Sequence, residues 1–324
     1  MNQNARTRPI AKDGEFREQH AIEVATLASG FNLSVPVLVV KGNREGPKIG
    51  ISATIHGDEI VGVQVVQELW NSLDPTTLSG SLWLMPVANP LAFESLSRNT
   101  PLDMLDLNRL FPGVRDGWFS EQLAAAIDEQ FLGKLDYYID LHAGGTFPLV
   151  DYCYLLNDEG LSRAFLSKLL YAPSPIYPGT TAGLTTGRKI PTTVVELGGG
   201  YVDQRDHVSR SVRGVINMLR YIGALSGEVE KLAGQLLMRK LRVIRPRAGG
   251  LCVPQRPLIP GEILLGQHKL AEIISPYSFE TLETLYTPFE NNILVLSRNY
   301  TSRVNPGDYA FMVGDLSTAT SWDS

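Results

Sequence analysis

Short apolar runs alternate with amphipathic stretches along the first two thirds of the chain. Runs at 33–40, 48–55 and 81–87 are bounded by turn residues and predict strands. Between the last two, residues 60–73 repeat apolar side chains at helical spacing, which predicts a helix. Its inward face consists of Val61, Val65, Val66, Leu69 and Leu73. The Gly- and Pro-containing segment 41–47 indicates a turn, so we expect strands 33–40 and 48–55 to form a hairpin.

The same alternation continues after a polar, irregular stretch at 89–117. A helix is predicted at 120–131, with Ser120 as its cap. Its inward residues are Leu123, Ala124, Ile127 and Phe131. Further strands are predicted at 137–142, 152–156 and 192–197, followed by a helix at 208–225. Strands that alternate with helices predict a mixed central α/β sheet with helices on both faces.

From about residue 240 the pattern changes to short strands separated by Pro and Gly. These strands are predicted at 241–244, 263–266, 271–274, 293–298 and 309–313. We therefore expect two domains, an α/β domain over 1–235 and a smaller all-β domain over 236–324. The second resembles the barrel-sandwich fold of lipoyl-type domains, but no lysine occupies an obvious hairpin tip. A supporting or lid role is favoured over that of a swinging arm.

Composition narrows the class of protein. The chain has 324 residues, 44% of them hydrophobic, and a net charge of -5 with scattered Lys and Arg, which argues against a nucleic-acid partner. Residues 1–8 lack the apolar core of a signal peptide, and no run of about 18 apolar residues occurs, so we expect a cytoplasmic protein without a membrane partner. Cys153 and Cys252 are isolated, which gives no support for a disulfide scaffold.

Three residues have the spacing of a catalytic zinc site. His56 and Glu59 stand three apart, and if Asp58 opens a helix, both can lean toward one ion. His142 ends a predicted strand and would be the third ligand. Two histidines and one carboxylate leave a position for water, as catalytic zinc sites do. The alternative is that His56 and Glu59 belong to an ordinary solvated helix start. The zinc site is favoured because two of only five histidines close predicted strands, at the edge where open α/β sheets bind ligands.

Four short motifs occur in a fixed order and suggest a known family. They are His-Gly-Asp-Glu at 56–59, Asp-Leu-Asn-Arg at 106–109, Asp-Leu-His at 140–142 and Val-Glu-Leu-Gly at 195–198. Together they resemble the succinylglutamate desuccinylase and aspartoacylase family. The resemblance implies a zinc carboxypeptidase-like fold, hydrolysis of the amide of N-acyl amino acids, and one zinc ion per chain. It also implies that His56, Glu59 and His142 bind this ion.

The resemblance further implies roles around the metal. Glu196 matches the catalytic carboxylate, and Arg98 matches the arginine that polarises the scissile carbonyl. Asn108 and Arg109 correspond to the pair that holds the substrate carboxylate. Without the other motifs, Glu196 would be read as a loop carboxylate and the arginines as surface ion pairs. The long Arg98 to Arg109 segment, the glycines after Glu196 and the β-rich C-terminal part resemble the bacterial N-acyl amino acid deacylase branch.

The expected function is that of a zinc-dependent deacylase. It would cleave the amide of a small N-acyl amino acid or related N-acyl amine, with a zinc-bound water as nucleophile and Glu196 as general base. Alternatives are a zinc carboxypeptidase acting on peptides and a non-catalytic binding protein on the same fold. A serine or cysteine hydrolase is disfavoured because no Gly-x-Ser-x-Gly elbow occurs and Cys153 has no motif-level partner histidine. A homo-oligomer is left open.

Overall fold

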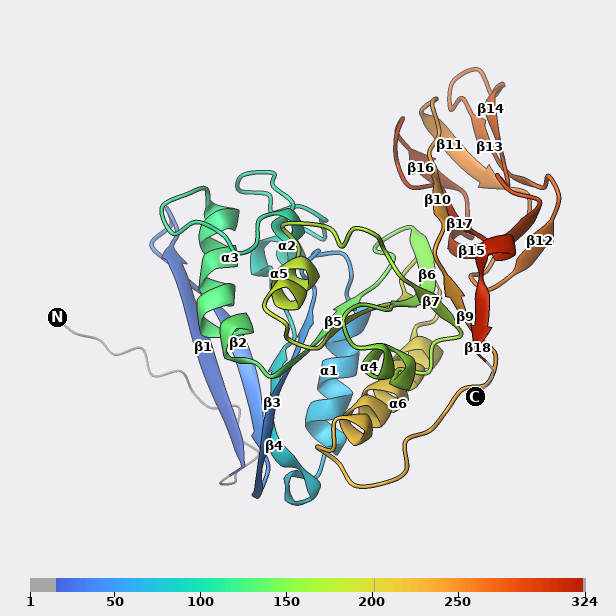
Figure 1. Ribbon diagram of the computed structural model, residues 1–324. Helices are drawn as coiled ribbons and strands as arrows, with labels where there is room; N and C mark the ends of the chain where they lie inside the picture. Colours follow the sequence, from blue (N-terminus) through green and yellow to red (C-terminus); the bar gives the residue numbers. More distant parts are fainter. Residues whose placement is uncertain (1–15, 201, 323–324) are drawn as a thin grey trace.

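The computed structural model describes residues 16–200 and 202–322, and a mixed sheet forms its centre (Figure 1). The strands of the first part are β1 (Arg17–Thr26), β2 (Asn32–Lys41), β3 (Arg44–Ala53), β4 (Ser79–Met85), β5 (Tyr137–His142), β6 (Pro148–Tyr154), β7 (Leu169–Tyr171) and β8 (Thr192–Gly198). They follow the order β1-β2-β4-β3-β5-β8-β6. Neighbours among β4, β3, β5 and β8 run parallel, whereas β2 and β6 join this block antiparallel.

Helices cover both faces of this sheet, as predicted. They are α1 (Val61–Ser72), α2 (Pro90–Glu94), α3 (Phe119–Gln130), α4 (Glu159–Ala164), α5 (Thr181–Gly187) and α6 (Arg205–Tyr221). On one face α1 and α4 pack against α6 over a core that includes Ile51 and Val40. On the other face α3 packs over a second core that includes Val37 and Val39. Successive residues of β2 thus enter different cores, as the two-residue period of a strand requires.

Short 3-10 helices complete the connections, at η1 (Pro75–Thr77), η2 (Leu107–Arg109), η3 (Leu132–Lys134) and η4 (Leu316–Thr318). The predicted inward faces of the two long helices are confirmed, because all their named apolar residues are buried. The predicted cap of α3 is wrong. Trp118 is the residue before this helix, and Ser120 lies inside it, where its hydroxyl donates to Asp103 at 2.8 Å. The carboxylate of Glu121 instead accepts the N–H of Trp118 at 2.8 Å.

The predicted hairpin between β2 and β3 is also wrong. β4 lies between these strands, antiparallel to β2 and parallel to β3. The reason is the crossover through α1, which returns the chain beside β3 and separates it from β2. β2 forms its hairpin with β1, a strand that the hydrophobic pattern did not predict. β1 is an edge strand in which Ile22 is the one fully buried residue, so its apolar signal is weak.

The C-terminal part consists of strands, as expected. They are β9 (Gln235–Met238), β10 (Leu241–Ile244), β11 (Gly250–Pro254), β12 (Ile263–Leu265), β13 (Lys269–Ile274), β14 (Thr281–Tyr286), β15 (Asn291–Arg298), β16 (Ser302–Val304), β17 (Phe311–Asp315) and β18 (Thr320–Trp322). A four-stranded sheet, β14-β13-β11-β16, stands apart from the large one. Apolar side chains such as Cys252, Leu270 and Phe311 form a core of their own in this part. Figure 1 shows this part projecting from the α/β body.

The large sheet continues into the C-terminal part. β15 pairs antiparallel with β6, with Leu296 opposite Val150, and β17 and β10 extend the sheet further. The domain boundary at 235/236 stays a prediction. The pairing of β15 with β6 joins strands on the two sides of this boundary. None of the helices in residues 16–200 and 202–322 is long and apolar enough to cross a bilayer. The predicted absence of a signal peptide concerns residues 1–8, which lie outside the described residues.

Candidate active site

Three strands of the parallel block end at one place and bring the predicted residues together. The register of β5 and β8 places His142 directly opposite Glu196. β3 ends at Ala53, and the chain reaches His56 and Glu59 within a few residues. Ligands of open α/β sheets bind at the carboxyl ends of the strands. The strand order therefore creates the candidate site.

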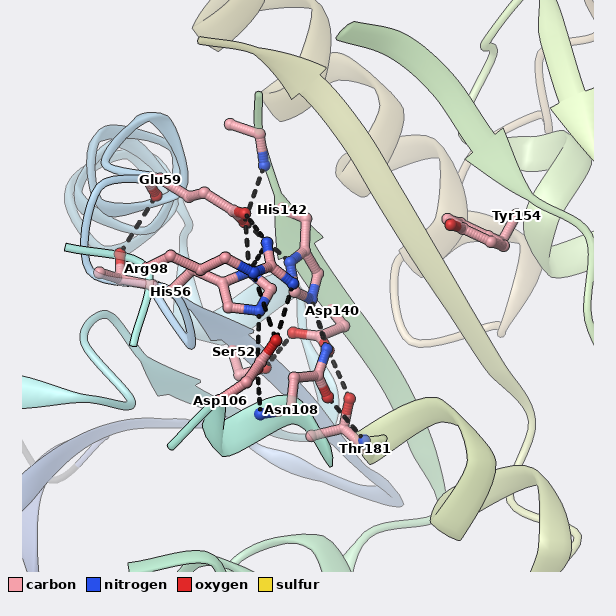
Figure 2. Close-up of polar contacts among 12 residues, drawn as sticks. Ser52, His56, Glu59, Arg98, Asp106, Asn108, Asp140, His142, Tyr154 and Thr181 are labelled. Carbon is pink, nitrogen blue, oxygen red and sulfur yellow. Dashed lines mark hydrogen bonds and ion pairs between the residues drawn. The ribbon is translucent and has the colours of Figure 1, made fainter. Parts of the chain in front are cut away.

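His56, Glu59 and His142 converge on one point. One ligand atom of each lies within 4.8 Å of the others, and all three side chains are buried. Glu59 lies between the imidazoles, with its Oε1 2.7 Å from His56 Nδ1 and its Oε2 2.8 Å from His142 Nδ1. Figure 2 shows both imidazoles turned toward this carboxylate. In the described part of the chain, no other group of His, Cys, Asp and Glu has this arrangement.

The turn that carries this motif is not the helix start that the spacing suggested. The N–H of Glu59 donates to the carbonyl of His56 at 3.2 Å, which closes a tight turn, and α1 begins only at Val61. Asp58 does not cap the helix. Its carboxylate instead accepts the N–H of Thr146 at 3.0 Å. Asp58 thereby ties this turn to the loop after β5.

The Nε2 atom of each of these two imidazoles, on the side away from Glu59, faces an aspartate. Asp106 Oδ1 lies 3.2 Å from His56 Nε2, and Asp140 Oδ2 lies 3.2 Å from His142 Nε2. When each Nε2–H donates to its aspartate, the Nδ1 lone pair points toward Glu59, where an ion would be bound. Asp140 stands two residues before His142 in the motif at 140–142. Asp106 was given no role, although its place in the motif Asp-Leu-Asn-Arg, before a predicted site pair, was the available signal.

Asp140 is itself held on both sides. Ser52 Oγ donates to its Oδ1 at 2.6 Å, and Thr181 Oγ1 donates to its Oδ2 at 2.6 Å. The Tyr138 hydroxyl lies 2.6 Å from the same serine. All four residues are buried. The carboxylate behind His142 is therefore fixed by hydrogen bonds before any ligand binds.

The electrostatics of the cluster favour a cation. Burial alone would lower the pKa of His142, but the Asp140 and Glu59 carboxylates outweigh it and hold that pKa well above its usual range. The pKa of His56 is raised as well, because Glu59 and Asp106 oppose the effect of burial. Burial would raise the pKa of Glu59, yet the two imidazoles lower it well below its usual value. Two imidazole nitrogens and a carboxylate oxygen form a donor set that fits zinc.

Arg98 lies at the edge of this cluster. Its guanidinium contacts Asp106, with Nη2 at 3.0 Å and Nε at 3.2 Å from Oδ2. Its Nη1 lies 3.7 Å from Glu59 Oε1. The same aspartate therefore contacts both His56 and Arg98. The predicted carbonyl-polarising residue is held beside the metal-binding residues by a carboxylate shared with one of them.

Asn108 and Arg109 lie on the other side, in η2. The Asn108 Oδ1 accepts the N–H of Thr181 at 3.0 Å, and its Nδ2 lies 3.4 Å from His142 Nε2. Arg109 donates from Nη1 to the carbonyl of Asn108 at 2.7 Å. Within residues 16–200 and 202–322 no carboxylate forms an ion pair with Arg109, whose side chain is exposed. Its remaining guanidinium donors are available for a ligand.

Glu196 completes the site. Burial raises the pKa of its carboxyl to about 7, and the charge of Glu59 adds to this, while His142 opposes it. No hydrogen bond joins the Glu196 carboxylate to the rest of the described chain. This carboxylate faces a cavity of about 270 Å³. All seven residues predicted from the sequence line this cavity, namely His56, Glu59, Arg98, Asn108, Arg109, His142 and Glu196.

Sequence comparison points to the same group of proteins. A profile described as the succinylglutamate desuccinylase/aspartoacylase catalytic domain matches residues 45–222, which is more than half of the chain. N-alpha-acetyl-L-2,4-diaminobutyric acid deacetylase of Halomonas elongata is 31% identical over 209 residues. That match covers 60% of this chain, and the chain spans about 60% of the length of this curated relative.

Structural comparison extends over nearly the whole chain. A succinylglutamate desuccinylase/aspartoacylase from Rhodobacter sphaeroides superimposes with a TM-score of 0.80 at 24% identity, covering 94% of this chain and 98% of that one. The product-bound ectoine utilization protein EutE (DoeB) from Ruegeria pomeroyi gives a TM-score of 0.81 at 22% identity, covering 94% and 97%. At these identities the likeness establishes a shared fold. With the matched catalytic-domain profile, it follows that the chain belongs to the succinylglutamate desuccinylase/aspartoacylase family.

Proposed function

We propose that this protein is a zinc-dependent hydrolase that cleaves the amide bond of a small N-acyl amino acid or related N-acyl amine. One observation carries the proposal. A buried His56, Glu59 and His142 cluster shares a cavity with the carboxylate of Glu196 and with the guanidinium of Arg109, which forms no ion pair within residues 16–200 and 202–322. The deacetylase activity named for the Halomonas elongata relative supports the same reaction class.

The metal-binding residues in this proposal are His56, Glu59 and His142, with one zinc ion per chain. When bound, zinc polarises a carbonyl oxygen and lowers the pKa of water toward ~7. Asp106 and Asp140 keep each imidazole in the tautomer that presents Nδ1 to the ion, because each carboxylate lies 3.2 Å from an Nε2 atom. The aspartates therefore act through the histidines and do not contact the substrate.

Glu196 is the proposed general base. Its carboxylate lies across from His142 and has no competing hydrogen bond in the described chain, so it can accept the proton of an attacking water. The same carboxyl can return the proton to the amine nitrogen as the C–N bond breaks. Arg98 is proposed to stabilise the negative charge that develops on the carbonyl oxygen. Its position 3.7 Å from Glu59 supports this role.

Asn108 and Arg109 are the proposed binding residues for a substrate carboxylate. A guanidinium presents two parallel N–H donors to a carboxylate, and Arg109 has donors free for such a pair. Asn108 is fixed between Thr181 and His142, which places the neighbouring arginine relative to the metal-binding residues. The substrate is therefore proposed to be a small molecule with a carboxylate near its scissile amide.

Metal content and amine release test this proposal together. Elemental analysis of the purified protein should give about one zinc per chain. The zinc-loaded protein should release free amine from members of a panel of N-acyl amino acids. Release from peptides but from no N-acyl amino acid would replace the deacylase by a carboxypeptidase. Failure to bind zinc even after reconstitution would overturn the proposal.

A further inference from the structure

The two inner residues of the motif His-Gly-Asp-Glu have no step in the proposed reaction, yet both fix the metal-binding turn. The N–H of Gly57 donates to the carbonyl of Ser97 at 2.9 Å, next to Arg98. A Cβ at position 57 would lie 2.0 Å from the carbonyl oxygen of Ala92, so this close approach requires glycine. Asp58 connects the same turn to another segment, the loop that follows β5.

The contact of Asp58 joins residues that are 88 positions apart. Its Oδ2 accepts the N–H of Thr146 at 3.0 Å and the hydroxyl of the same threonine at 3.3 Å. Gly145 permits this approach, because its φ is +73° and a Cβ there would lie 2.4 Å from the same oxygen. A side chain at position 58 without an acceptor oxygen would lose both hydrogen bonds.

The loop at 143–147 also reaches a proposed metal ligand through its first residue. The N–H of Ala143 donates to Glu59 Oε2 at 3.2 Å. His56 and His142 also present Nδ1 to this carboxylate, but these are the nitrogens proposed to bind the ion. When they bind an ion they cannot donate to Glu59. Among the described residues, the Ala143 N–H is then the hydrogen-bond donor that still holds Oε2, and such bonds orient a ligating carboxylate.

The middle of this loop is attached on two sides. The N–H of Gly144 donates to the carbonyl of Gly198 at 3.1 Å, and the N–H of Gly200 donates to the carbonyl of Gly145 at 2.9 Å. These bonds hold the loop against the end of β8 and the residues after it. The carboxylate of Asp58 holds the loop against the metal-binding turn. The position of the loop relative to that turn therefore depends on Asp58.

We infer that Asp58 is a positioning residue of the metal site, which keeps the Ala143 N–H on Glu59 by anchoring the loop through Thr146. This inference rests on the proposed function, because it takes Glu59 as a metal ligand. Loss of a hydrogen-bond partner of a ligand costs about 10- to 100-fold in metal affinity. Asp58 acts one step further away, so we expect Asp58→Ala to weaken zinc binding by about tenfold, at the lower end of that range.

Competition with a chelator measures the zinc affinity of two variants at this position. Asp58→Asn keeps an oxygen that can accept the Thr146 N–H, so it should retain the affinity of the unchanged protein. Asp58→Ala removes the acceptor and should show the loss. An equal loss in both variants would assign the effect to the charge and overturn the hydrogen-bonded link. If Asp58→Ala fails to fold, Asp58→Ser replaces it, because the shorter side chain withdraws the oxygen from Thr146.

Asp136 provides a matched control, because it makes the same kind of bond between the same two regions of the chain. Its Oδ2 accepts the N–H of Lys48 at 2.8 Å, where the pairing of β3 with β5 begins, at the end away from the site. Asp136→Ala should lower the stability of the metal-free protein in a denaturant titration but leave its zinc affinity unchanged. If it weakens zinc binding as much as Asp58→Ala does, the loss reflects general stability and the inference is wrong.

Amide hydrogen exchange on the metal-free protein gives a measurement that needs neither zinc nor substrate. Asp58→Ala should speed exchange in the peptide that covers 143–147, where the Thr146 N–H loses its acceptor. Asp58→Asn and Asp136→Ala should leave this exchange unchanged. Unchanged exchange or unchanged zinc affinity in Asp58→Ala would overturn the inference and leave the proposed function standing. Failure of the unchanged protein to bind zinc would overturn both.

Discussion

Glu196 and His142 occupy paired positions on neighbouring strands, yet the proposal gives them separable roles. His142 would bind the metal, whereas Glu196 would move a proton. Glu196→Gln keeps the size and most of the polarity of the side chain but removes its basicity. We expect this variant to keep about one zinc per chain. Its turnover should fall by about 10² to 10⁴, which a steady-state assay would measure.

The matched variant is His142→Ala, which should lose zinc as well as activity. It removes a proposed ligand while leaving the Glu196 carboxylate in place. Elemental analysis of both proteins, after identical dialysis, distinguishes the two roles. Full activity in Glu196→Gln would remove this residue from the mechanism, and full zinc content in His142→Ala would remove the histidine from the ligand set.

Asp106 is proposed to position two neighbouring side chains. It holds His56 at 3.2 Å and Arg98 at 3.0 Å. Asp106→Asn keeps a similar shape but loses the charge that raises the pKa of His56 and neutralises the guanidinium. We expect zinc affinity to fall by about 10- to 100-fold, measured by competition with a chelator. Asp116→Asn, which changes an exposed carboxylate of the same segment, should keep the zinc affinity of the unchanged protein. Equal zinc affinities for both variants and the unchanged protein would exclude the positioning role of Asp106.

Cys153 is a buried thiol to which the proposed mechanism gives no role. Burial in β6 raises its pKa to about 12, and that of Cys252 is raised to about 11. Because of the raised pKa, both thiols stay protonated at pH 8. Reaction with a thiol reagent requires the thiolate. We expect the native protein to react slowly with a thiol reagent at pH 8 and to release two rapidly reacting thiols when denatured. Rapid labelling of the native chain would show that one thiol is exposed.

The residues of the site differ in whether the sequence alone could identify them. His56, Glu59, His142 and Glu196, which line one cavity, could be singled out because each belongs to a short motif next to an apolar strand. Their meeting point follows from strand order, which motifs alone do not give. Asp106 was missed because its role depends on a distance to a residue 50 positions away. The support of Asp140 by hydroxyl groups was missed for the same reason.

Helix α1 connects the metal-binding turn to the core, and its apolar face was predicted correctly. Leu69 is fully buried between this helix and the sheet. Leu69→Ala removes that packing and leaves a cavity, so we expect a loss of about 2 to 5 kcal/mol in the free energy of unfolding. Gln67→Ala, on the exposed face of the same helix, should change it by less than about 0.5 kcal/mol. Similar values for the two variants in denaturant titrations would contradict this packing.

Elements with strong periodicity were predictable, and their pairing was not. The strand at 137–142 and the helix α1 follow local patterns that the sequence displays directly. The hairpin of β2 with β3 was a wrong prediction, because a parallel crossover places β4 between them. β1 was missed since it lies at the sheet edge and buries little apolar surface. Register and neighbours depend on contacts that no single segment specifies.

At the scale of the whole molecule, one sheet joins the two parts that composition separates. β15 hydrogen-bonds to β6 across the predicted boundary, with Leu296 opposite Val150. The hydrophobic cluster beneath this pairing includes Val150 and Tyr152 from one part and Val295 and Met312 from the other. The change of pattern near residue 240 was visible in the sequence, but the continuity of the sheet was not. The lining of the cavity depends on that continuity, because Val150 of the first part and Leu296 and Met312 of the second all line it.

Truncation at residue 235 tests whether the first part is stable alone. The cut removes β15 and exposes the edge of β6 together with Val150, Tyr152 and Leu169, which are buried in the intact chain. An unpaired strand edge beside a large apolar surface favours association. We expect the truncated chain to aggregate and to lack a cooperative thermal transition, measured by size-exclusion chromatography and circular dichroism.

The control for truncation is a change in the same part that leaves β6 covered. Shortening the turn at 276–280, where Tyr277 and Phe279 are exposed, removes residues between β13 and β14 but no strand of the large sheet. This variant should remain monodisperse and unfold cooperatively, because the β6 and β15 pairing is retained. If the chain ending at 235 folds as well as this control, the first part is an independent domain. The C-terminal strands would then contribute lining residues to the cavity without being needed for the fold that carries the metal-binding residues.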